Sequence, residues 1–429
     1  MNDADFFLLL TTNIYTYIFS LAISFLCFYP ILKLYKFHIF HPYFIHFVFT
    51  VFANSIPVFL FLVKECTARD FYYFVLAEAL FWLGFVIFLS KKKDRYFKYY
   101  IKDDTFIMSL MFYFFLVLFL LITIFSYIKY GIPLFMWSRV ALYVDSGGAG
   151  IIGRMQPMLK IYCIYYAITK LFNGTKSSIK KTFFIFVLII FVVEGVLSGS
   201  KSSFIFFIVA YYFYNIINKK SFLNKRSFIV TILLLIIVTG VLGSVINGNS
   251  FKYGTFVFFK RFISSGDVYF YGMPNQVYKS VHIGHPFDFI VSSFLVPARL
   301  MDPSAVDLHT GNQLFYLIYT ELEGLMSGPN SRMPFLSIVL FGWSGGLIFS
   351  FFSGIVFSLL TNLVKIFFYG NRLFFPMYIY TILMLSQFIF DITMGIGSLF
   401  SIFVNLMIYL SVALISVLFV KIQTIERNA

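Results

Sequence analysis

Long apolar runs separated by short polar gaps recur from one end of the chain to the other. A run of about 20 apolar residues is the length that a helix needs to cross the hydrocarbon core of a bilayer. The pattern therefore predicts an all-α polytopic membrane protein. It predicts eleven membrane-spanning helices, near residues 6–29, 39–62, 72–90, 105–128, 156–172, 182–198, 203–217, 228–246, 336–361, 374–391 and 398–420.

The gaps between these runs divide the chain into three regions. Residues 1–246 are expected to form the first eight spans, with a short outer loop at 129–155. Residues 247–335 form one large outer loop, and residues 336–429 hold the last three spans and a tail. Within the large loop, "HPFDFIVSSFLVPARL" and "NQLFYLIYTELEGLM" have helical spacing of apolar residues and predict short helices along the membrane surface. A loop of this length usually has a function.

Charge placement sets the orientation. The net charge is +15, and if the acidic start "MNDAD" lies outside, 20 of the 33 Lys and Arg residues fall on the inner side when nearby residues within the spans are counted. This excess follows the positive-inside rule, so the charge indicates topology rather than a nucleic-acid partner. The amino terminus is predicted outside and the carboxyl terminus in the cytoplasm. The first 30 residues lack the features of a removable signal peptide, so the first span is expected to be retained.

The outer basic residues are the functional candidates, because the same rule makes them unfavourable there. A guanidinium binds two phosphate oxygens at once, whereas an ammonium acts as a point charge. The candidates for binding a phosphate-bearing ligand are Arg139, Arg154, Lys201, Arg261, Arg299 and Arg332. The alternatives are that they pair with outer acids, as Lys201 would with Glu194, or reach toward lipid head groups. The glycines of "SGGAG" at 146–150 would let backbone N–H groups approach the same anion.

Outer acids and histidines are candidates for proton transfer. Asp267 is the favoured catalytic residue, followed by Glu321 and Glu323, with His309 after them. The spacing of His282, His285 and Asp288 is interrupted by Pro286, and the three cysteines have no CxxC spacing, so no metal site is predicted. No GxSxG or HExxH motif occurs, and no cofactor is expected.

The layout of nearly the whole chain resembles the Wzy-type O-antigen polymerases. Arg139 to Gly150 and Arg261 to Gly272 both read as arginine, ten residues and glycine, a pattern of the outer loops of that family. The stretches "LSGSKSSF" (197–204), "KRFISSGDVYFYG" (260–272) and "LFGWSGGLIFSFFSG" (340–354) are also similar, although Lys201 stands where arginine is usual. Tyr271, in the second stretch, joins the substrate-binding candidates.

This resemblance implies a GT-C-like membrane glycosyltransferase of lipopolysaccharide biosynthesis in the bacterial inner membrane. Its substrate would be an oligosaccharide repeat unit linked to undecaprenyl pyrophosphate, polymerised at the periplasmic face without metal or cofactor. The arginines would stabilise charge on the departing pyrophosphate, and a base would take the proton of the acceptor hydroxyl. The implied partners are membrane lipid, a flippase and a chain-length regulator, with no nucleic acid.

Three other readings stay open. An O-antigen ligase uses the same donor with lipid A core as acceptor, and often a catalytic histidine, for which His309 or His282 would serve. A flippase for the same lipid-linked units typically has short loops, unlike the large loop here. A structural assembly partner without catalysis is the third alternative.

Overall fold

The computed structural model describes residues 1–35, 40–89, 105–135, 150–174, 177–199, 203–218, 260–322, 328–369 and 371–428. Every regular element within these ranges is helical. Six of the helices are long and apolar enough to cross a membrane, at Ile14–Leu34, Pro42–Leu62, Ala68–Phe88, Phe106–Phe135, Met333–Phe368 and Ile392–Ile422. The chain is therefore a helical multi-pass membrane protein. Eleven spans remain a prediction, and the run at 228–246 lies outside the described ranges.

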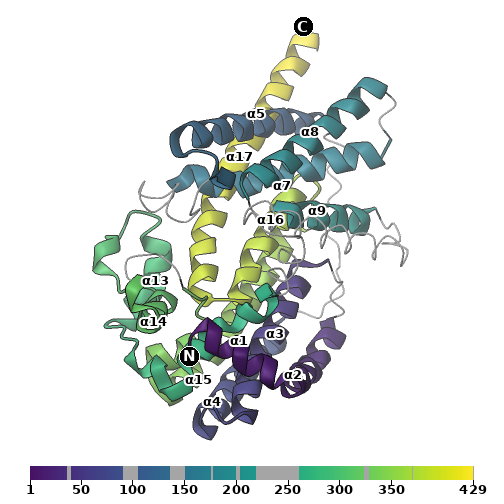
Figure 1. The fold of residues 1–429 in the computed structure, drawn as a ribbon. Helices are drawn as coiled ribbons and strands as arrows, with labels where there is room; N and C mark the ends of the chain where they lie inside the picture. Colours follow the sequence, from purple (N-terminus) through teal and green to yellow (C-terminus); the bar gives the residue numbers. More distant parts are fainter. Residues whose placement is uncertain are drawn as a thin grey trace. The chain divides into compact units, whose positions relative to one another are not determined.

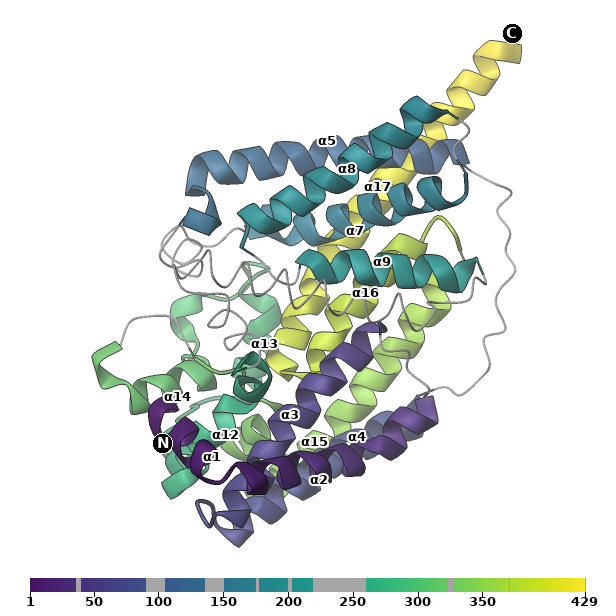
Figure 2. The ribbon, with the colours of Figure 1, turned by 45° about the vertical axis from the view of Figure 1, so that its right-hand side comes forward.

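The chain divides into two compact units, neither of which is one continuous segment. Unit 1 comprises Met1–Lys92, Val257–Leu363 and Leu383–Phe400, and unit 2 comprises Lys93–Phe256, Val364–Ile382 and Ser401–Ala429. Figure 1 labels most of their helices, and Figure 2 also labels α12.

Unit 1 holds the amino-terminal helices and the short helices of the predicted large loop. Its α-helices are α1 (Asp3–Thr12), α2 (Ile14–Tyr35), α3 (Pro42–Leu62), α4 (Ala68–Phe88), α12 (Asp267–Gly272), α13 (Pro286–Leu295), α14 (Thr310–Ile318) and most of α15 (Met333–Phe368). The 3-10 turns are η2 (Ser264–Gly266), η3 (Pro274–Ser280), η4 (Pro303–Ala305), η5 (Thr320–Leu322) and η6 (Ser386–Ile389). The two short helices predicted in the large loop are confirmed as α13 and α14.

The expected first span, 6–29, is not one helix. The Asn13 side chain donates to the carbonyl of Leu9 at 3.0 Å, and the hydroxyl of Thr12 bonds the same carbonyl at 2.9 Å. These local bonds compete with the helical ladder and end α1 before α2 begins. Phe6 is fully buried, so α1 packs into the core of unit 1 and the apolar span starts at Ile14.

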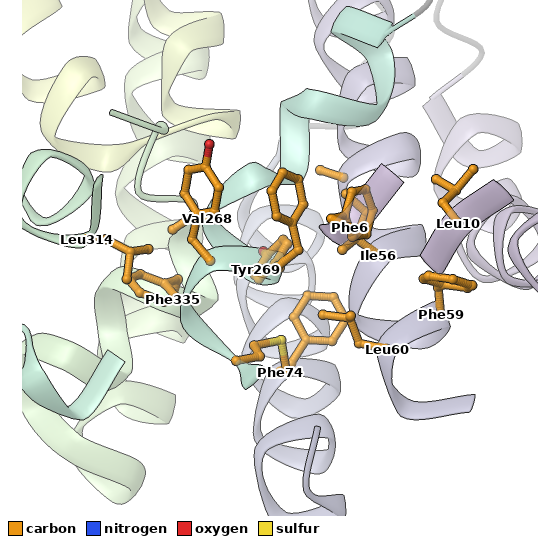
Figure 3. Close-up of a cluster of buried hydrophobic side chains, with 14 of the residues drawn as sticks. Phe6, Leu10, Ile56, Phe59, Leu60, Phe74, Val268, Tyr269, Leu314 and Phe335 are labelled. Carbon is orange, nitrogen blue, oxygen red and sulfur yellow. The ribbon is translucent and has the colours of Figure 1, made fainter. Parts of the chain in front are cut away.

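The core of unit 1 joins segments that lie far apart in the sequence. The ring of Phe6 stacks on Phe270 of α12 at 4.0 Å between centroids, and Phe74 of α4 meets Tyr269 edge-on at 5.2 Å. Figure 3 shows Phe6, Phe74 and Tyr269 with Val268, Leu314 and Phe335 in one cluster, to which Phe270 also belongs. Burying aromatic rings of this size stabilises the fold by several kcal/mol. The cluster therefore fixes α12, which carries Asp267 at its first residue.

Glycines bring α4 and α15 together. A Cβ at Gly84 would lie 2.3 Å from the carbonyl oxygen of Phe351, and one at Gly354 would lie 2.0 Å from that of Phe81. Both helices therefore approach at backbone distance, as small residues permit between membrane helices. Near the other end of the contact, the hydroxyls of Tyr73 and Ser337 are 2.8 Å apart.

Unit 2 is built around α7. Its helices are α5 (Thr105–Tyr130), α7 (Gly150–Phe172), α8 (Ser178–Leu197), α9 (Ser203–Ile217) and most of α16 (Phe375–Leu385) and α17 (Ile392–Asn428), with the turn η1 (Pro133–Phe135). Helix α7 packs against α5, α8 and α9, which lie side by side in Figure 2. Lys160 of α7 and Glu194 of α8 form an ion pair with side chains only 4% and 14% exposed.

Candidate functional site

A buried arginine, Arg332, directly precedes α15 in unit 1. Only 2% of its surface is exposed, and its φ of 42° lies in the left-handed region that few residues other than glycine adopt. Its Nε donates to the carbonyl of Ser265 at 2.9 Å, and Nη1 donates to the hydroxyl of Thr50 at 3.3 Å. The guanidinium carbon lies 4.5 Å from the centre of the Phe390 ring. Two neutral acceptors and an aromatic face therefore hold the side chain.

The charge of Arg332 is not balanced by a direct ion pair. Among the described residues, Nη2 has no hydrogen-bond partner, and no carboxylate lies within ion-pair distance of the guanidinium. Burial is the largest influence and lowers the pKa of the guanidinium, while the surrounding Tyr269 and acidic residues oppose this effect. A buried charged donor without a partner costs more than the roughly 1–3 kcal/mol of a neutral one. Nη2 therefore keeps a donor that no described residue uses.

Two further polar atoms beside Arg332 lack partners among the described residues. The Tyr269 hydroxyl and Nδ1 of His46 are buried and make no hydrogen bond there, and both groups interact electrostatically with Arg332. Glu78 of α4 also interacts electrostatically with Arg332, and its carboxylate accepts a hydrogen bond from Nε1 of Trp82 at 2.8 Å. Buried polar groups in folded proteins are nearly always paired, so several unpaired ones together indicate a functional site.

Asp267 lies in the same unit, and its pKa is raised from 3.8 to about 7. Burial of the carboxyl group is the main cause, and the charge of Asp3 adds to it. The N–H of Val268, which donates to Oδ1 at 3.0 Å, and the charge of Arg332 lower the pKa and only partly offset the burial. A carboxyl group that titrates near neutral pH is suited to exchange protons with a substrate.

His309 and Asp391 form a second acid–base pair. Nε2 of His309 lies 3.4 Å from Oδ2 of Asp391 and 3.0 Å from the hydroxyl of Thr393. Asp391 is fully buried, and its carboxylate also accepts the N–H of Ser331 at 3.0 Å and the N–H of Thr393 at 2.8 Å. Because Ser331 precedes Arg332 in the chain, this network also holds the buried arginine in place.

The two members of this pair shift in opposite directions. Burial lowers the pKa of His309, but the hydrogen bond and charge of Asp391 outweigh it, so the net shift is upward. Burial raises the pKa of Asp391, but His309, Thr393 and the N–H of Ser331 outweigh it and hold the pKa well below its usual range. Both shifts favour the ionised form of the pair, and 33% of the His309 side chain is exposed.

Tyr271, expected to contact substrate, instead donates its hydroxyl to Oδ1 of Asp3 at 2.7 Å. The other oxygen of Asp3 accepts a hydrogen bond from Lys260 at 3.2 Å. The phenol is thus engaged with the amino-terminal acids, which the sequence pattern related only to orientation.

The remaining candidates are dispersed. Arg261, Arg299 and Glu321 are exposed in unit 1, and Arg299 has a φ of 59°. Arg154 lies in unit 2, where its Nη1 donates to the hydroxyl of Ser401 at 2.8 Å and its carbonyl accepts from Asn405 at 2.9 Å. Glu194 pairs with Lys160. Arg139, Lys201 and Glu323 lie outside the described residues.

Sequence reasoning overlooked Glu78 and Asp391. Both occur within or at the end of long apolar runs, at positions where an ionisable residue is energetically costly and therefore a functional candidate by itself. The structure places Asp267, His309 and Arg332 in unit 1. Glu78, Asp391 and Tyr269 interact electrostatically with Arg332, and Asp391 also interacts with His309.

The arrangement combines the buried cation of Arg332, the carboxyl group of Asp267, which titrates near pH 7, and the hydrogen-bonded pair of His309 and Asp391. Such a set can stabilise negative charge on one group while it removes a proton from another. Within the described residues, no group of three or more His, Cys, Asp or Glu side chains is placed to hold a metal ion. The chain matches no protein-family model, no curated protein and no solved structure.

Proposed function

We propose that this protein is a membrane glycosyltransferase that joins repeat units linked to undecaprenyl pyrophosphate into a surface polysaccharide such as O-antigen. One observation carries the proposal. Arg332 is buried with one guanidinium nitrogen unpartnered among the described residues, and the neighbouring carboxyl group of Asp267 has a pKa of about 7. The resemblance of the sequence to the Wzy-type polymerases supplies the substrate.

Each residue has a defined role in this proposal. The leaving pyrophosphate gains negative charge in the transition state, and a preorganised guanidinium in a low-dielectric site stabilises that charge more than it stabilises the ground state. Asp267 accepts the proton of the attacking sugar hydroxyl. Exposed Arg261 and Arg299 are assigned to the first contacts with the anionic donor, and Tyr271 remains a candidate for glycan positioning. Arg139, Arg154 and Lys201 stay predictions from the sequence alone.

Access to Arg332 requires an opening step. The side chain is 2% exposed, so a phosphate oxygen reaches Nη2 only after a covering group moves. The strained backbone of Arg332, with φ of 42°, supports such a step because strain of this kind costs on the order of 1–3 kcal/mol and is relieved by movement. The closed state would exclude water until the donor is bound.

The test measures the length of lipid-linked glycan on a silver-stained gel in a deletion strain complemented at matched membrane levels. Arg332→Gln is expected to slow chain growth roughly 100- to 1,000-fold, the usual effect of removing one such donor. Arg332→Lys keeps a point charge and should recover part of the activity. The control is Lys64→Ala, an exposed basic residue in the loop between α3 and α4. Full-length ladders from Arg332→Gln would refute the proposal.

The His309–Asp391 pair favours a second candidate, an O-antigen ligase with a histidine base. The same strain distinguishes the two activities. If His309→Gln leaves a full ladder of lipid-linked polymer that is never transferred to lipid A core, the protein is a ligase. If the ladder itself collapses to single repeat units, the pair belongs to the polymerase.

A further inference from the structure

A separate pocket of about 320 Å³ opens in unit 1 between the start of α4, the turn η3 and α15. Its polar and aromatic lining consists of Arg69, Asp70, Gln276, Tyr278, Lys279 and Trp343. None of these residues belongs to the Arg332 cluster. The volume is at the lower end of the range for small-molecule sites, so it suits one compact ligand rather than a long chain.

Asp70 organises the pocket with neutral donors only. It is 5% exposed, and its carboxylate accepts the hydroxyl of Thr67 at 2.6 Å, Nε2 of Gln276 at 2.9 Å and the hydroxyl of Tyr278 at 2.8 Å. A carboxylate offers about four acceptor positions, so one position remains for a ligand hydroxyl. The Asp70 carboxylate is therefore held by neutral donors, without an ion pair to Arg69 or Lys279.

The polypeptide is strained where it supplies Gln276. Asn275 and Gln276 have φ values of 52° and 56°, two consecutive non-glycine residues in the left-handed region. Each such conformation costs on the order of 1–3 kcal/mol and persists only where the surroundings enforce it. Here it turns the Gln276 amide toward Asp70, so the strain serves the geometry of the pocket.

Two cations at the rim are available to a ligand. Arg69 is exposed and makes no hydrogen bond or ion pair with the described residues. Lys279 is exposed and donates to the neutral amide oxygen of Gln276. The pocket thus has two positive charges at its mouth, and the one negative charge lies on its floor among neutral donors.

A break in α15 forms the opposite wall. Gly342 has φ of 66° and ψ of −165°, which interrupts the helix, and a Cβ there would meet no atom within 4 Å. The regular i to i−4 bonds cannot all form across this break, and Gly342 itself lines the pocket. Irregular backbone in a membrane helix is tolerated where it lines a cavity. Trp343, 37% exposed, follows immediately and offers an aromatic surface.

We propose that this pocket binds a single sugar ring that carries a carboxylate, such as a hexuronate. The carboxylate matches the planar guanidinium of Arg69 and the ammonium of Lys279. The ring hydroxyls match the free position of Asp70, the Gln276 amide and the backbone at Gly342. The apolar face of the ring covers Trp343 and Tyr278. This inference does not depend on the proposed polymerase activity.

The test is binding of D-glucuronate to the purified full-length protein in detergent, measured by isothermal titration calorimetry. D-glucose and inorganic phosphate are the comparison probes. Glucuronate is expected to bind roughly ten- to a hundredfold more tightly than glucose, and Arg69→Ala should remove most of this preference. Trp343→Ala should weaken both sugars. Lys64→Ala, in the loop that precedes α4 and outside the pocket, should change neither.

Arg69 is exposed, so its truncation should not unfold the protein, and thermal unfolding of each variant checks this. The proposal is overturned if glucuronate does not bind, if glucose binds equally well, or if Arg69→Ala leaves the preference intact. Phosphate that displaces glucuronate with equal affinity would also overturn it, because the pocket would then recognise a simple anion or a phosphate headgroup.

Discussion

The raised pKa of Asp267 predicts that Asp267→Asn stabilises the fold while it abolishes activity. Asparagine has nearly the same shape as a protonated aspartic acid and cannot ionise. In the native protein the half-buried carboxyl group titrates at about 7 instead of 3.8, so above neutral pH the fold carries an unfavourable, partly desolvated charge. The substitution removes that charge and also removes the proposed base.

The magnitude follows from linkage. Since the native pKa is raised, the contribution of Asp267 to stability is fully present below pH 3.8 and is lost as pH rises to about 7. A shift of about three pKa units corresponds to roughly 4 kcal/mol, of which about 2–3 kcal/mol is lost between pH 5 and pH 8. The gain in stability from Asp267→Asn should therefore be larger at pH 8 than at pH 5.

The assay is thermal unfolding of the detergent-solubilised protein at both pH values, paired with the glycan-ladder measurement. The matched control is Asp302→Asn, because that carboxylate is exposed, bonds Ser304 and has a lowered pKa, so it is ionised in both states across this range. Polymer formation by the wild type should rise through an inflection near pH 7. An equal change in the stability of Asp267→Asn at both pH values, or wild-type activity without that inflection, would refute the reasoning.

Two further predictions concern the support of the site. Asp391→Asn should destabilise the fold by about 3–5 kcal/mol near pH 6, because it leaves the imidazolium of His309 without its buried partner. The loss should be smaller at pH 9, because the ion pair is lost as pH rises through the raised pKa of His309. An equal loss of stability at both pH values would contradict this. Gly272→Ala should destabilise by about 1–3 kcal/mol because the new Cβ would lie 2.2 Å from the ring of Phe335, whereas Gly284→Ala, with its nearest atom at 3.7 Å, should not. Thermal unfolding distinguishes these two glycine variants, and similar midpoints would refute the predicted clash.

The sequence predicted the helical membrane character because the length and apolarity of a run depend only on neighbouring residues. It also predicted α13 and α14 from local periodicity. It failed at Asn13, where side-chain hydrogen bonds to the preceding turn end α1 inside an apolar run. Hydropathy averaged over a run does not detect side-chain hydrogen bonds that compete locally with the backbone hydrogen bonds of the helix.

For the site, the sequence identified Asp267, His309 and Arg332 as individual candidates by residue type and position. Only the tertiary structure decided that Arg332 is buried with an unpartnered nitrogen among the described residues, that Asp267 titrates near pH 7 and that His309 meets Asp391, 82 residues away. Burial and ion pairing depend on long-range packing. The apolar pattern along the chain determines which segments enter the membrane, and the contacts between those segments determine which polar groups lose water together.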